Sequence, residues 1–471
     1  MPAFQELMDI RAGEPLPEGE VAIRGADPVF STTFKAGQTC AAAIAAVGVA
    51  VSDLWQMKTG RRQLVGVDVR RAAAALRSAH YLQQADAEGR FAALSNPAYE
   101  KHQRITRPWP TRDGRWFLPH FALPNLQERV LKVLDCAFEQ DAVARAVGRW
   151  DALELENAID EARGCGAMVR SNAEWLAHPH GAMLARKPVV EVIRIGDSDP
   201  EKLPAGERPL AGIRVLDLTR ILAGPIAART LAEHGADVLA LTARGLPQTL
   251  EHVMDTGHGK RSAYLDLKTA EGRQAALELV RRADVFSQGY RPGAMDRLGF
   301  SPAALARIRP GIVYCSISCF GSDGPFSHRA GWEQIGQTVS GICHDGHPQR
   351  PRLVPAPICD YTTGYLGAFG IALALARRAR EGGSYHVRVS LCQSAMLVYR
   401  QGQIPYPGAG LELADVELEA FRMTTETPYG RLRHLAPVLQ LSETPPRWSR
   451  PTPKLGRDRP EWLPEPGANP L

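Results

Sequence analysis

The chain of 471 residues is 44% apolar and 23% charged, which is the balance of an ordinary globular protein and excludes a mostly disordered or coiled-coil chain. Its length predicts two or three compact units. The formal charge of +5 comes from 56 basic and 51 acidic residues without a dense basic block, so nucleic acid is not an expected partner, whereas small anionic metabolites are compatible.

The N-terminus has no basic segment followed by an apolar run, so the sequence predicts no signal peptide. The richest apolar stretch, residues 365–375, is closely followed by Arg377 and Arg378, and is too short to span a bilayer. Eight cysteines without close pairs fit reduced, buried thiols better than disulfides or zinc ligands. We therefore expect a cytoplasmic protein with no membrane segment and no bound metal.

The first part of the chain, residues 1–112, changes character twice. Residues 1–30 are polar and interrupted by Pro and Gly, which predicts an irregular arm. Residues 38–57 are rich in Ala and Val and predict a buried helix, followed by a turn at Gly60 and a strand at 65–67. Residues 80–112 lose this periodicity and are interpreted as a connector.

Residues 113–195 predict a small α+β domain. A strand around Trp116 precedes three helices near 126–136, 139–149 and 151–163, and a further strand at 189–195 closes the unit. Ser171 followed by Glu174 is a capping-box pattern and predicts one more helix. The stretch 196–209 holds three prolines and reads as an exposed linker.

Strands alternate with helices over residues 210–424, which is typical of right-handed βαβ units. Predicted strands cover 213–218, 237–241, 263–267, 284–288, 312–317 and 386–391, and helices begin near Thr219, Thr269, Ser301 and Thr362. The predicted fold class is α/β, a doubly wound Rossmann-like parallel sheet with a second, smaller α+β domain. Residues 425–471 are rich in Pro and predict an extended tail that wraps the body.

An internal repeat of low identity appears when the chain is shifted by 322 positions, the separation of Asp360 and Gln38. The shared pattern is an Ala-rich helix, a Gly turn and a Val-x-Val strand, so residues 31–112 are interpreted as a partial repeat of the large domain with a connector. Ala-rich helices resemble one another readily, so coincidence stays open. Asp360 of the second copy faces Gln38 in the first copy.

Phosphate-binding motifs are absent from the usual places. The strand at 213–218 leads to Gly224 without a G-x-G-x-x-G pattern, and the Gly259–Ser262 run lacks the first glycine of a Walker motif. Basic residues near the predicted carboxyl ends of the strands are Lys260, Arg261, Lys268, Arg291 and Arg297. They are placed to hold phosphates, although solvated helix ends explain any one of them equally well.

A set of short segments carries a family resemblance. They are Leu210–Thr219, Gly224-Pro225, Gly235–Val238, Gly259–Ser262, Leu265–Lys268, Gln288–Gly293, Arg297–Gly299, Val313–Ser318, Phe320-Gly321, Gly324-Pro325, Ser340-Gly341, Asp360–Gly364 and Val387–Leu391. Each is weak alone, but in this order the segments resemble the family III CoA-transferases, the formyl-CoA transferase-like or CaiB-BaiF group. Residues 113–195 resemble the smaller domain of that family, which ordinarily follows the Rossmann half. The altered order suggests a partial duplication or permutation.

The resemblance implies a site and its ligands. Asp360 takes the place of the catalytic aspartate. The positions implied to contact CoA are Lys268, Arg291, Arg297 and Leu298, with Leu222, Ala223 and Gly224 near the reacting thioester. The resemblance further implies acyl-CoA and a carboxylic acid as partners, no covalently bound cofactor, and a homodimer.

The mechanism implied by the resemblance passes through an aspartyl-CoA thioester on Asp360. Backbone amides at 362–364 and near Ala223 and Gly224 are candidate oxyanion donors. An Asp before a helix also has a simpler role as an N-cap. Two other functions stay open: a racemase of the α-methylacyl-CoA type, which needs a histidine where this chain has Trp332, and a CoA-binding protein without catalysis.

Overall fold

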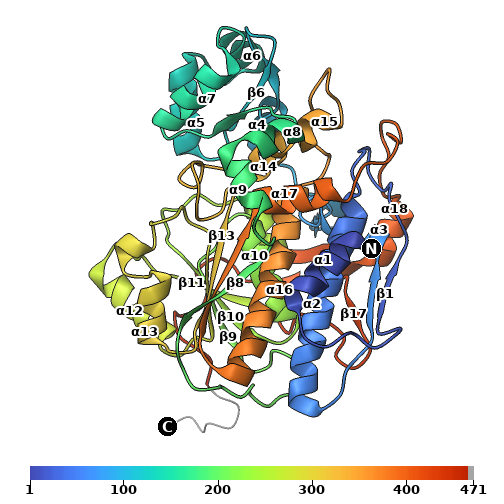
Figure 1. Ribbon diagram of the computed structural model, residues 1–471, viewed down its shortest axis with the longest axis vertical. Helices are drawn as coiled ribbons and strands as arrows, with labels where there is room; N and C mark the ends of the chain where they lie inside the picture. Colours follow the sequence, from blue (N-terminus) through green and yellow to red (C-terminus); the bar gives the residue numbers. More distant parts are fainter. Residues whose placement is uncertain (465–471) are drawn as a thin grey trace.

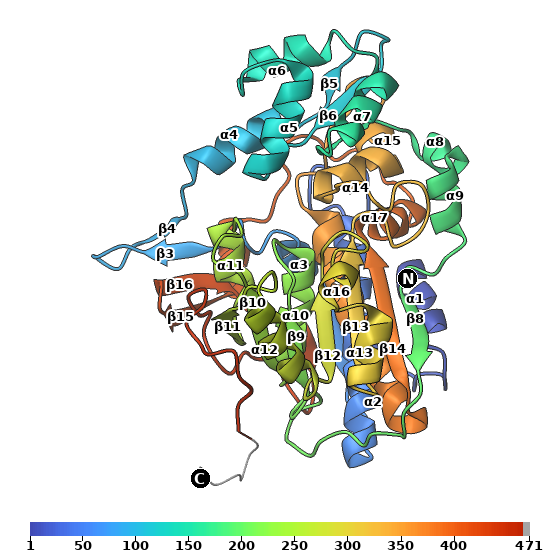
Figure 2. The ribbon, with the colours of Figure 1, turned by 90° about the vertical axis from the view of Figure 1, so that its left-hand side faces the viewer.

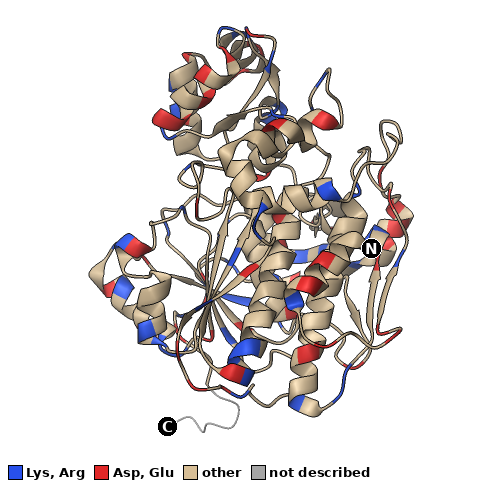
Figure 3. Ribbon diagram, in the orientation of Figure 1, with Lys and Arg blue, Asp and Glu red and all other residues tan. Residues whose placement is uncertain are grey.

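The computed structural model describes residues 1–464, and the last part of the predicted tail, 465–471, lies outside the described residues. A large body built around one extended sheet carries a smaller lobe at one end, as Figures 1 and 2 show. The lobe, residues 97–170, has its own apolar core, which includes Trp109, Phe117 and Ile159. Basic and acidic residues are intermixed over the surface elements (Figure 3).

The central sheet has seven strands in the order β11-β10-β9-β12-β13-β14-β8, and all neighbours are parallel except β8, which runs antiparallel to β14. The strands are β8 (Glu191–Gly196), β9 (Arg214–Asp217), β10 (Asp237–Thr242), β11 (Lys260–Tyr264), β12 (Val285–Gln288), β13 (Val313–Ser318) and β14 (Ser384–Ser390). The predicted α/β class and its parallel sheet are confirmed.

Two of these strands depart from the prediction. β11 begins at Lys260, three residues before the predicted apolar run, because the buried Lys260 and Arg261 are neutralised by carboxylates on neighbouring strands. β8 does not close the small lobe but joins the large sheet, where Val192 pairs with Val387. Both differences depend on partners that are distant in sequence.

Helices cover both faces of the sheet because alternate strand residues point to opposite sides. Val215, Val285 and Val313 face the core beneath α10 and α16, whereas Leu216 and Phe286 face the core beneath α12 and α13. The bounds are α10 (Ala223–Glu233), α11 (Leu250–Thr256), α12 (Ala270–Val280), α13 (Pro302–Ile308), α14 (Glu333–Ser340), α15 (Ile342–Asp345), α16 (Ile358–Glu381) and α17 (Leu391–Arg400), with the short 3-10 helix η1 (Asp296–Leu298).

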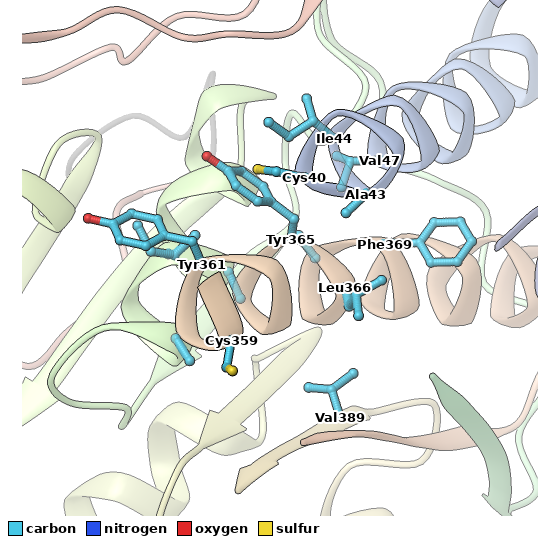
Figure 4. Packing of buried hydrophobic residues seen from close by; sticks show 14 of the residues in the cluster. Cys40, Ala43, Ile44, Val47, Cys359, Tyr361, Tyr365, Leu366, Phe369 and Val389 are labelled. Atoms are coloured by element: carbon cyan, nitrogen blue, oxygen red, sulfur yellow. The ribbon is translucent and has the colours of Figure 1, made fainter. Parts of the chain in front are cut away.

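The internal repeat of the sequence has a counterpart in three dimensions. α2 (Ala36–Thr59) and α16 both have 24 residues, and their ends are offset by the same 322 positions. β2 (Val65–Asp68) and α3 (Val69–Ala75) correspond in the same way to β14 and α17. Figure 4 shows Cys40 and Ile44 of α2 beside Tyr365 of α16. The two halves therefore pack directly against each other through their equivalent helices.

These two helices correct the expectation about apolar length. α2 and α16 are each long and apolar enough to cross a membrane by length and composition, but 83% and 100% of their most apolar windows are buried. Their burial against the sheet and against each other is that of core helices. The sequence estimate was wrong because it ended the apolar run at Arg377, whereas the neighbouring Arg378 is itself buried and pairs with Asp284.

The N-terminal arm and the connector contain regular structure that the sequence did not predict. α1 (Pro2–Arg11) packs on α2 through the buried Ala3 and Leu7, which are one helical turn apart. β1 (Val21–Arg24) pairs in parallel with β2, and β17 (Gln440–Leu441) pairs antiparallel with β2. The connector holds β3 (Gln83–Ala85), β4 (Phe91–Ala93), α4 (Pro97–Ile105) and β5 (Trp109–Pro110).

The small lobe follows the predicted pattern closely. It contains β6 (Trp116–Pro119), α5 (Pro124–Leu134), α6 (Gln140–Val147), α7 (Ala152–Glu161) and β7 (Gly166–Met168). Beyond it come α8 (Asn172–Ala177) and α9 (Pro179–Ala185), and the Ser171–Glu174 capping box is present. All eight cysteines are free thiols, and seven are buried.

The C-terminal segment begins with structure where a tail was predicted. α18 (Asp415–Phe421), β15 (Arg422–Thr427) and β16 (Gly430–Leu435) precede β17, and β16 pairs with β3. From 442 to 464 the chain has no helix or strand and runs beside β11, where the Asp458 N–H donates to the Ser262 carbonyl at 2.7 Å.

Candidate active site

Asp360 lies in the first turn of α16, as the third helical residue. The sequence predicted that the helix would begin near Thr362 with Asp360 ahead of it, so this prediction is wrong by one turn. The side chain is 8% exposed. No hydrogen bond to its carboxylate is present among the described residues, and its oxygens are not among the fully buried polar atoms that lack a partner.

Glu333 explains why the helix begins early. It is the first residue of α14, and its Oε1 accepts the Cys359 N–H at 3.2 Å while its Oε2 accepts the Asp360 N–H at 2.6 Å. The first N–H groups of any helix lack partners within the helix, and here a carboxylate from another helix supplies them. Asp360 is therefore not the cap of α16, and its own carboxylate stays unbonded.

The electrostatics of the pair favour the protonated forms. Burial, and then the neighbouring Glu333 carboxylate, hold the pKa of Asp360 well above its usual range. Burial also raises the pKa of Glu333, against the hydrogen bonds that it accepts from Gln337 and from the start of α16. Once ionised, Asp360 is thus a stronger base than an exposed aspartate.

The loop from Leu222 to Gly224 lies against α16 one turn after Asp360. A Cβ added at Gly364 would lie 2.7 Å from the Ala223 carbonyl oxygen and 2.6 Å from Ile226 Cβ, and one added at Gly224 would lie 2.2 Å from Thr219 Cβ. Glycine at position 364 lets the backbones of α10 and α16 approach, whereas glycine at position 224 lets Thr219 pack against the start of α10. The structure therefore brings Leu222, Ala223 and Gly224 together with the helix that carries Asp360.

The predicted oxyanion donors separate into two groups. The N–H groups of 362–364 lie beyond the first turn of α16 and are within its hydrogen-bonding pattern, so they are not available as donors. The N–H groups of Ala223 and Gly224 begin α10, where the helix leaves donors unpaired. For the second group the oxyanion role stays a prediction.

Three of the predicted basic residues are free of ion pairs among residues 1–464: Lys268, Arg291 and Arg297 are all exposed. Arg291 follows β12, and Arg297 and the half-buried Leu298 lie on η1 in the same loop, whereas Lys268 follows β11. Burial of its inner part lowers the pKa of Arg291. These charges lie at the carboxyl edge of the sheet, where open α/β sheets bind ligands.

The other two basic candidates are structural. Lys260 Nζ lies 3.0 Å from Asp217 Oδ2, and Arg261 lies 3.1 Å from Asp237 Oδ2. Lys260 and Arg261 are buried. Their positive charges are neutralised inside the sheet, so they are not available to a phosphate.

A hollow lies beside the ends of β9 and β10. Thr219, Arg220 and Gln248 line it, and Pro453 and Leu455 of the C-terminal segment form one wall. The sequence analysis missed Arg220 and Gln248. The signal was the polar Thr219-Arg220 pair directly after the first strand of the parallel sheet, where ligand-binding loops occur.

A row of rings approaches the site from the small lobe, and sequence reasoning missed it as well. His120 stacks on Trp332 with ring centroids 5.2 Å apart, and His102 contacts His120 at 5.5 Å. Burial lowers the pKa of His102 to about 4 and that of His120 to about 3. Both imidazoles are therefore neutral at physiological pH, and no spacing pattern in the sequence joins residues so far apart.

The comparison with known proteins shows what this site is similar to. The family model for CoA-transferase family III matches residues 210–410. The chain is similar to CoA-transferase family III over this segment. The matched residues include Asp360, the start of α10 and the basic loop from Arg291 to Leu298, but not the rings of the small lobe or the C-terminal wall of the hollow.

Several named proteins are similar to parts of this chain. The acetyl-coenzyme A transferase nodX of Hypoxylon pulicicidum is 36% identical over 316 residues, which cover 61% of this chain and 53% of the relative. The succinyl-CoA:glutarate CoA-transferase of Mus musculus is 32% identical over 211 residues, 41% of this chain and 48% of that one. A CAIB/BAIF family protein from Brucella suis of known structure is 29% identical, with a TM-score of 0.39, over 48% of this chain and 65% of that one. The chain spans about half the length of the curated relatives it matches.

Proposed function

We propose that the chain transfers CoA between carboxylic acids through an aspartyl-CoA thioester on Asp360. The observation that carries the proposal is an unbonded carboxylate in the first turn of α16, with its backbone N–H held by Glu333 and with the free donors of α10 one turn away. A carboxylate engaged in capping would be a weaker nucleophile, because the hydrogen bonds that it accepts stabilise its charged form.

The first half-reaction uses two displacements at carbonyl carbons. An oxygen of Asp360 attacks the carbonyl carbon of the donor thioester. The carbon–sulfur bond breaks, CoA departs as a thiolate, and a mixed anhydride of Asp360 and the donor acid is formed. The thiolate then attacks the aspartyl carbonyl carbon and releases the donor acid with the bridging oxygen. The acceptor carboxylate repeats these steps in reverse, which restores the Asp360 carboxylate and forms the new acyl-CoA.

The residues around Asp360 favour this chemistry in three ways. The Ala223 and Gly224 N–H groups begin α10, whose first turn lies against α16 beside Gly364, and would stabilise the oxyanion that develops at each step. Burial of Asp360 limits the access of water, which would otherwise hydrolyse the anhydride. Glu333 fixes the backbone of Asp360, so the carboxylate is positioned before the substrate arrives.

The basic loop and the hollow fit the CoA body. Lys268, Arg291 and Arg297 offer charged donors that no acidic side chain of residues 1–464 neutralises, as phosphate binding requires. Leu298 is half-buried in the same loop and offers apolar contact. CoA and acyl-CoA act here as substrates, with a carboxylic acid as the second partner.

No observation favours either alternative function. The racemase would need a second acid/base beside Asp360, and Trp332, which stacks on His120, has no group that exchanges a proton at physiological pH. A CoA-binding protein without catalysis would not need the unbonded Asp360 carboxylate. The cytoplasmic location stays a prediction.

Trapping the intermediate tests the proposal. The full chain is incubated with a panel of acyl-CoA thioesters and digested, and mass spectrometry measures adducts on the peptide that contains Asp360. We expect an adduct in the wild type and none in Asp360→Asn. The matched control is Asp197→Asn, because Asp197 is exposed and lies far outside the site in sequence. Racemisation of a 2-methylacyl-CoA without any exchange or adduct would contradict the proposal.

A further inference from the structure

The first copy of the repeat keeps the capping arrangement of the active site but not its nucleophile. The Asp27 carboxylate accepts the Gly37 N–H at 3.1 Å and the Gln38 N–H at 2.8 Å. The same shift of 322 positions carries these two residues onto Cys359 and Asp360, whose N–H groups Glu333 accepts at 3.2 and 2.6 Å. A carboxylate therefore caps α2 as another caps α16.

The strands beside the two helices repeat the same pairing. β2 lies between the parallel β1 and the antiparallel β17, as β14 lies between the parallel β13 and the antiparallel β8. The registers correspond: Gly66 pairs with Gln440, and Arg388, which is 322 positions later, pairs with Glu191. The repeat therefore includes three strands as well as the helices.

The contacts between the halves are reciprocal. After α3, the Ser78 Oγ and the Ala79 N–H lie 3.0 and 3.1 Å from the Tyr361 hydroxyl, at the start of α16. After α17, the Ile404 N–H donates to the Thr33 carbonyl at 2.8 Å, just before α2.

Tyr399, at the end of α17, also contacts Phe34 with ring centroids 5.7 Å apart. An interface in which the end of one half meets the start of the other, in both directions, is the mark of two-fold symmetry. The two halves are therefore related as two subunits of a dimer are related.

The first half has lost the means of catalysis. An amide at position 38 has no carboxylate to attack a thioester, and the Gln38 Oε1 accepts the Asp27 N–H at 3.2 Å. The sheet around β2 ends at β1 among residues 1–464, with no counterpart of β9 to β12 and hence no crevice for CoA.

The second half, in contrast, obtains from the same chain the parts that enclose its site. Tyr361, the neighbour of Asp360, is held by Ser78 and Ala79 of the first half. The small lobe, which precedes the large sheet in sequence, joins α14 through the Arg170 N–H, which donates to the Thr338 carbonyl at 3.1 Å, and through His120 on Trp332.

We propose that one chain is a complete two-fold unit, in which residues 21–79, together with β17, occupy the place of a second subunit and Asp360 is the single reacting centre. This inference replaces the homodimer that the family resemblance implied. The symmetry argument does not depend on the proposed activity, whereas the count of reacting centres rests on it.

Light scattering behind size-exclusion chromatography tests the first part on the wild-type full chain. We expect the mass of one chain, 51.4 kDa, at every concentration at which the protein is active, and a specific activity that does not fall on dilution. Twice that mass at an active concentration, or activity lost as a dimer dissociates, would overturn the proposal. The measured mass tests the two-fold unit even if no adduct forms. Failure of this inference can therefore be distinguished from failure of the proposed function.

Adduct counting tests the second part. We expect at most one CoA adduct per chain in the wild type, and none at position 38 when Gln38→Asp is combined with Asp360→Asn. Gln38→Asp alone should keep the wild-type adduct at Asp360, which shows that the variant folds. An adduct at position 38 in the combined variant would overturn the claim that the first half is silent.

Discussion

The Glu333 carboxylate holds the backbone N–H of Asp360 at 2.6 Å and at the same time faces the Asp360 side chain as a second buried acid. One residue thus fixes the position of the proposed nucleophile and raises its pKa. The two effects are separable by substitution, because a neutral side chain can keep a hydrogen bond while it removes the charge.

Glu333→Gln should move the acid limb of the pH–rate profile to lower pH. The substitution removes the charge that is the second cause of the raised Asp360 pKa and leaves burial, the first cause, in place. The pH dependence of kcat/KM for CoA exchange measures the shift. An unchanged acid limb would show that Glu333 does not act on Asp360 through its charge.

Glu333→Ala should also destabilise the fold. It leaves the Cys359 and Asp360 N–H groups without their acceptor, and the loss of a helix cap costs about 1–2 kcal/mol. Chemical denaturation of both variants measures this cost, and Glu333→Gln should lose less because one amide oxygen remains. Equal stabilities of Glu333→Ala and the wild type would contradict the capping role.

Asp360→Asn should abolish exchange and stabilise the protein near neutral pH. Because the folded-state pKa is raised, the folded state binds the proton more tightly than the unfolded state, so stability falls as pH rises through the folded-state pKa. The neutral amide removes this loss at pH 7. The difference in unfolding free energy should vanish at acidic pH, where both side chains are uncharged. A variant that is less stable at neutral pH would contradict the direction of the shift.

Gly364→Ala should separate the start of α10 from α16. The new methyl group would lie 2.6 Å from Ile226 Cβ and 2.7 Å from the Ala223 carbonyl, and overpacking of this kind costs about 1–3 kcal/mol. We expect a large fall in kcat as the Ala223 and Gly224 donors move. Gly367→Ala in the same helix is the matched control, because its closest contact would be 3.3 Å from a side chain. Equal activity in the two variants would show that catalysis does not require the close approach of α10 and α16.

Arg291→Ala should weaken acyl-CoA binding far more than it slows the reaction of the bound substrate. The loss of a charge-assisted hydrogen bond to a phosphate is worth about 1.5–3 kcal/mol, so we expect KM for acyl-CoA to rise roughly 10- to 100-fold with kcat little changed. Lys202→Ala is the control, because Lys202 is an exposed cation in the linker. Steady-state kinetics separate the two constants, and a fall in kcat at unchanged KM would contradict the binding role.

The features that were predicted correctly from the sequence are those that a local pattern of residues determines. The β-branched runs around Val215, Val285 and Val313 indicated the strands of a parallel sheet, and the Ser171–Glu174 spacing indicated a cap that the structure contains. The repeat was visible as a match between two segments 322 positions apart, and Asp360 was a candidate through the family resemblance carried by many short segments.

The rest depends on partners that lie far away along the chain. The early start of α16 follows from Glu333, 27 residues before Asp360, and the early start of β11 follows from Asp217, which neutralises Lys260 inside the sheet. β8 was assigned to the small lobe because nothing local shows that Val192 pairs with Val387. Tertiary pairing of this kind has no signature at fixed spacing.

Transfer of a heavy oxygen isotope tests the central claim most directly. An acceptor acid labelled in its carboxylate is incubated with acyl-CoA and the full chain, and the digested peptide that contains Asp360 is weighed. The account predicts that one labelled oxygen enters the Asp360 carboxylate, because the bridging oxygen of the second anhydride stays with the enzyme. Continued exchange of CoA with an unlabelled Asp360 peptide would show that the transfer does not pass through this residue.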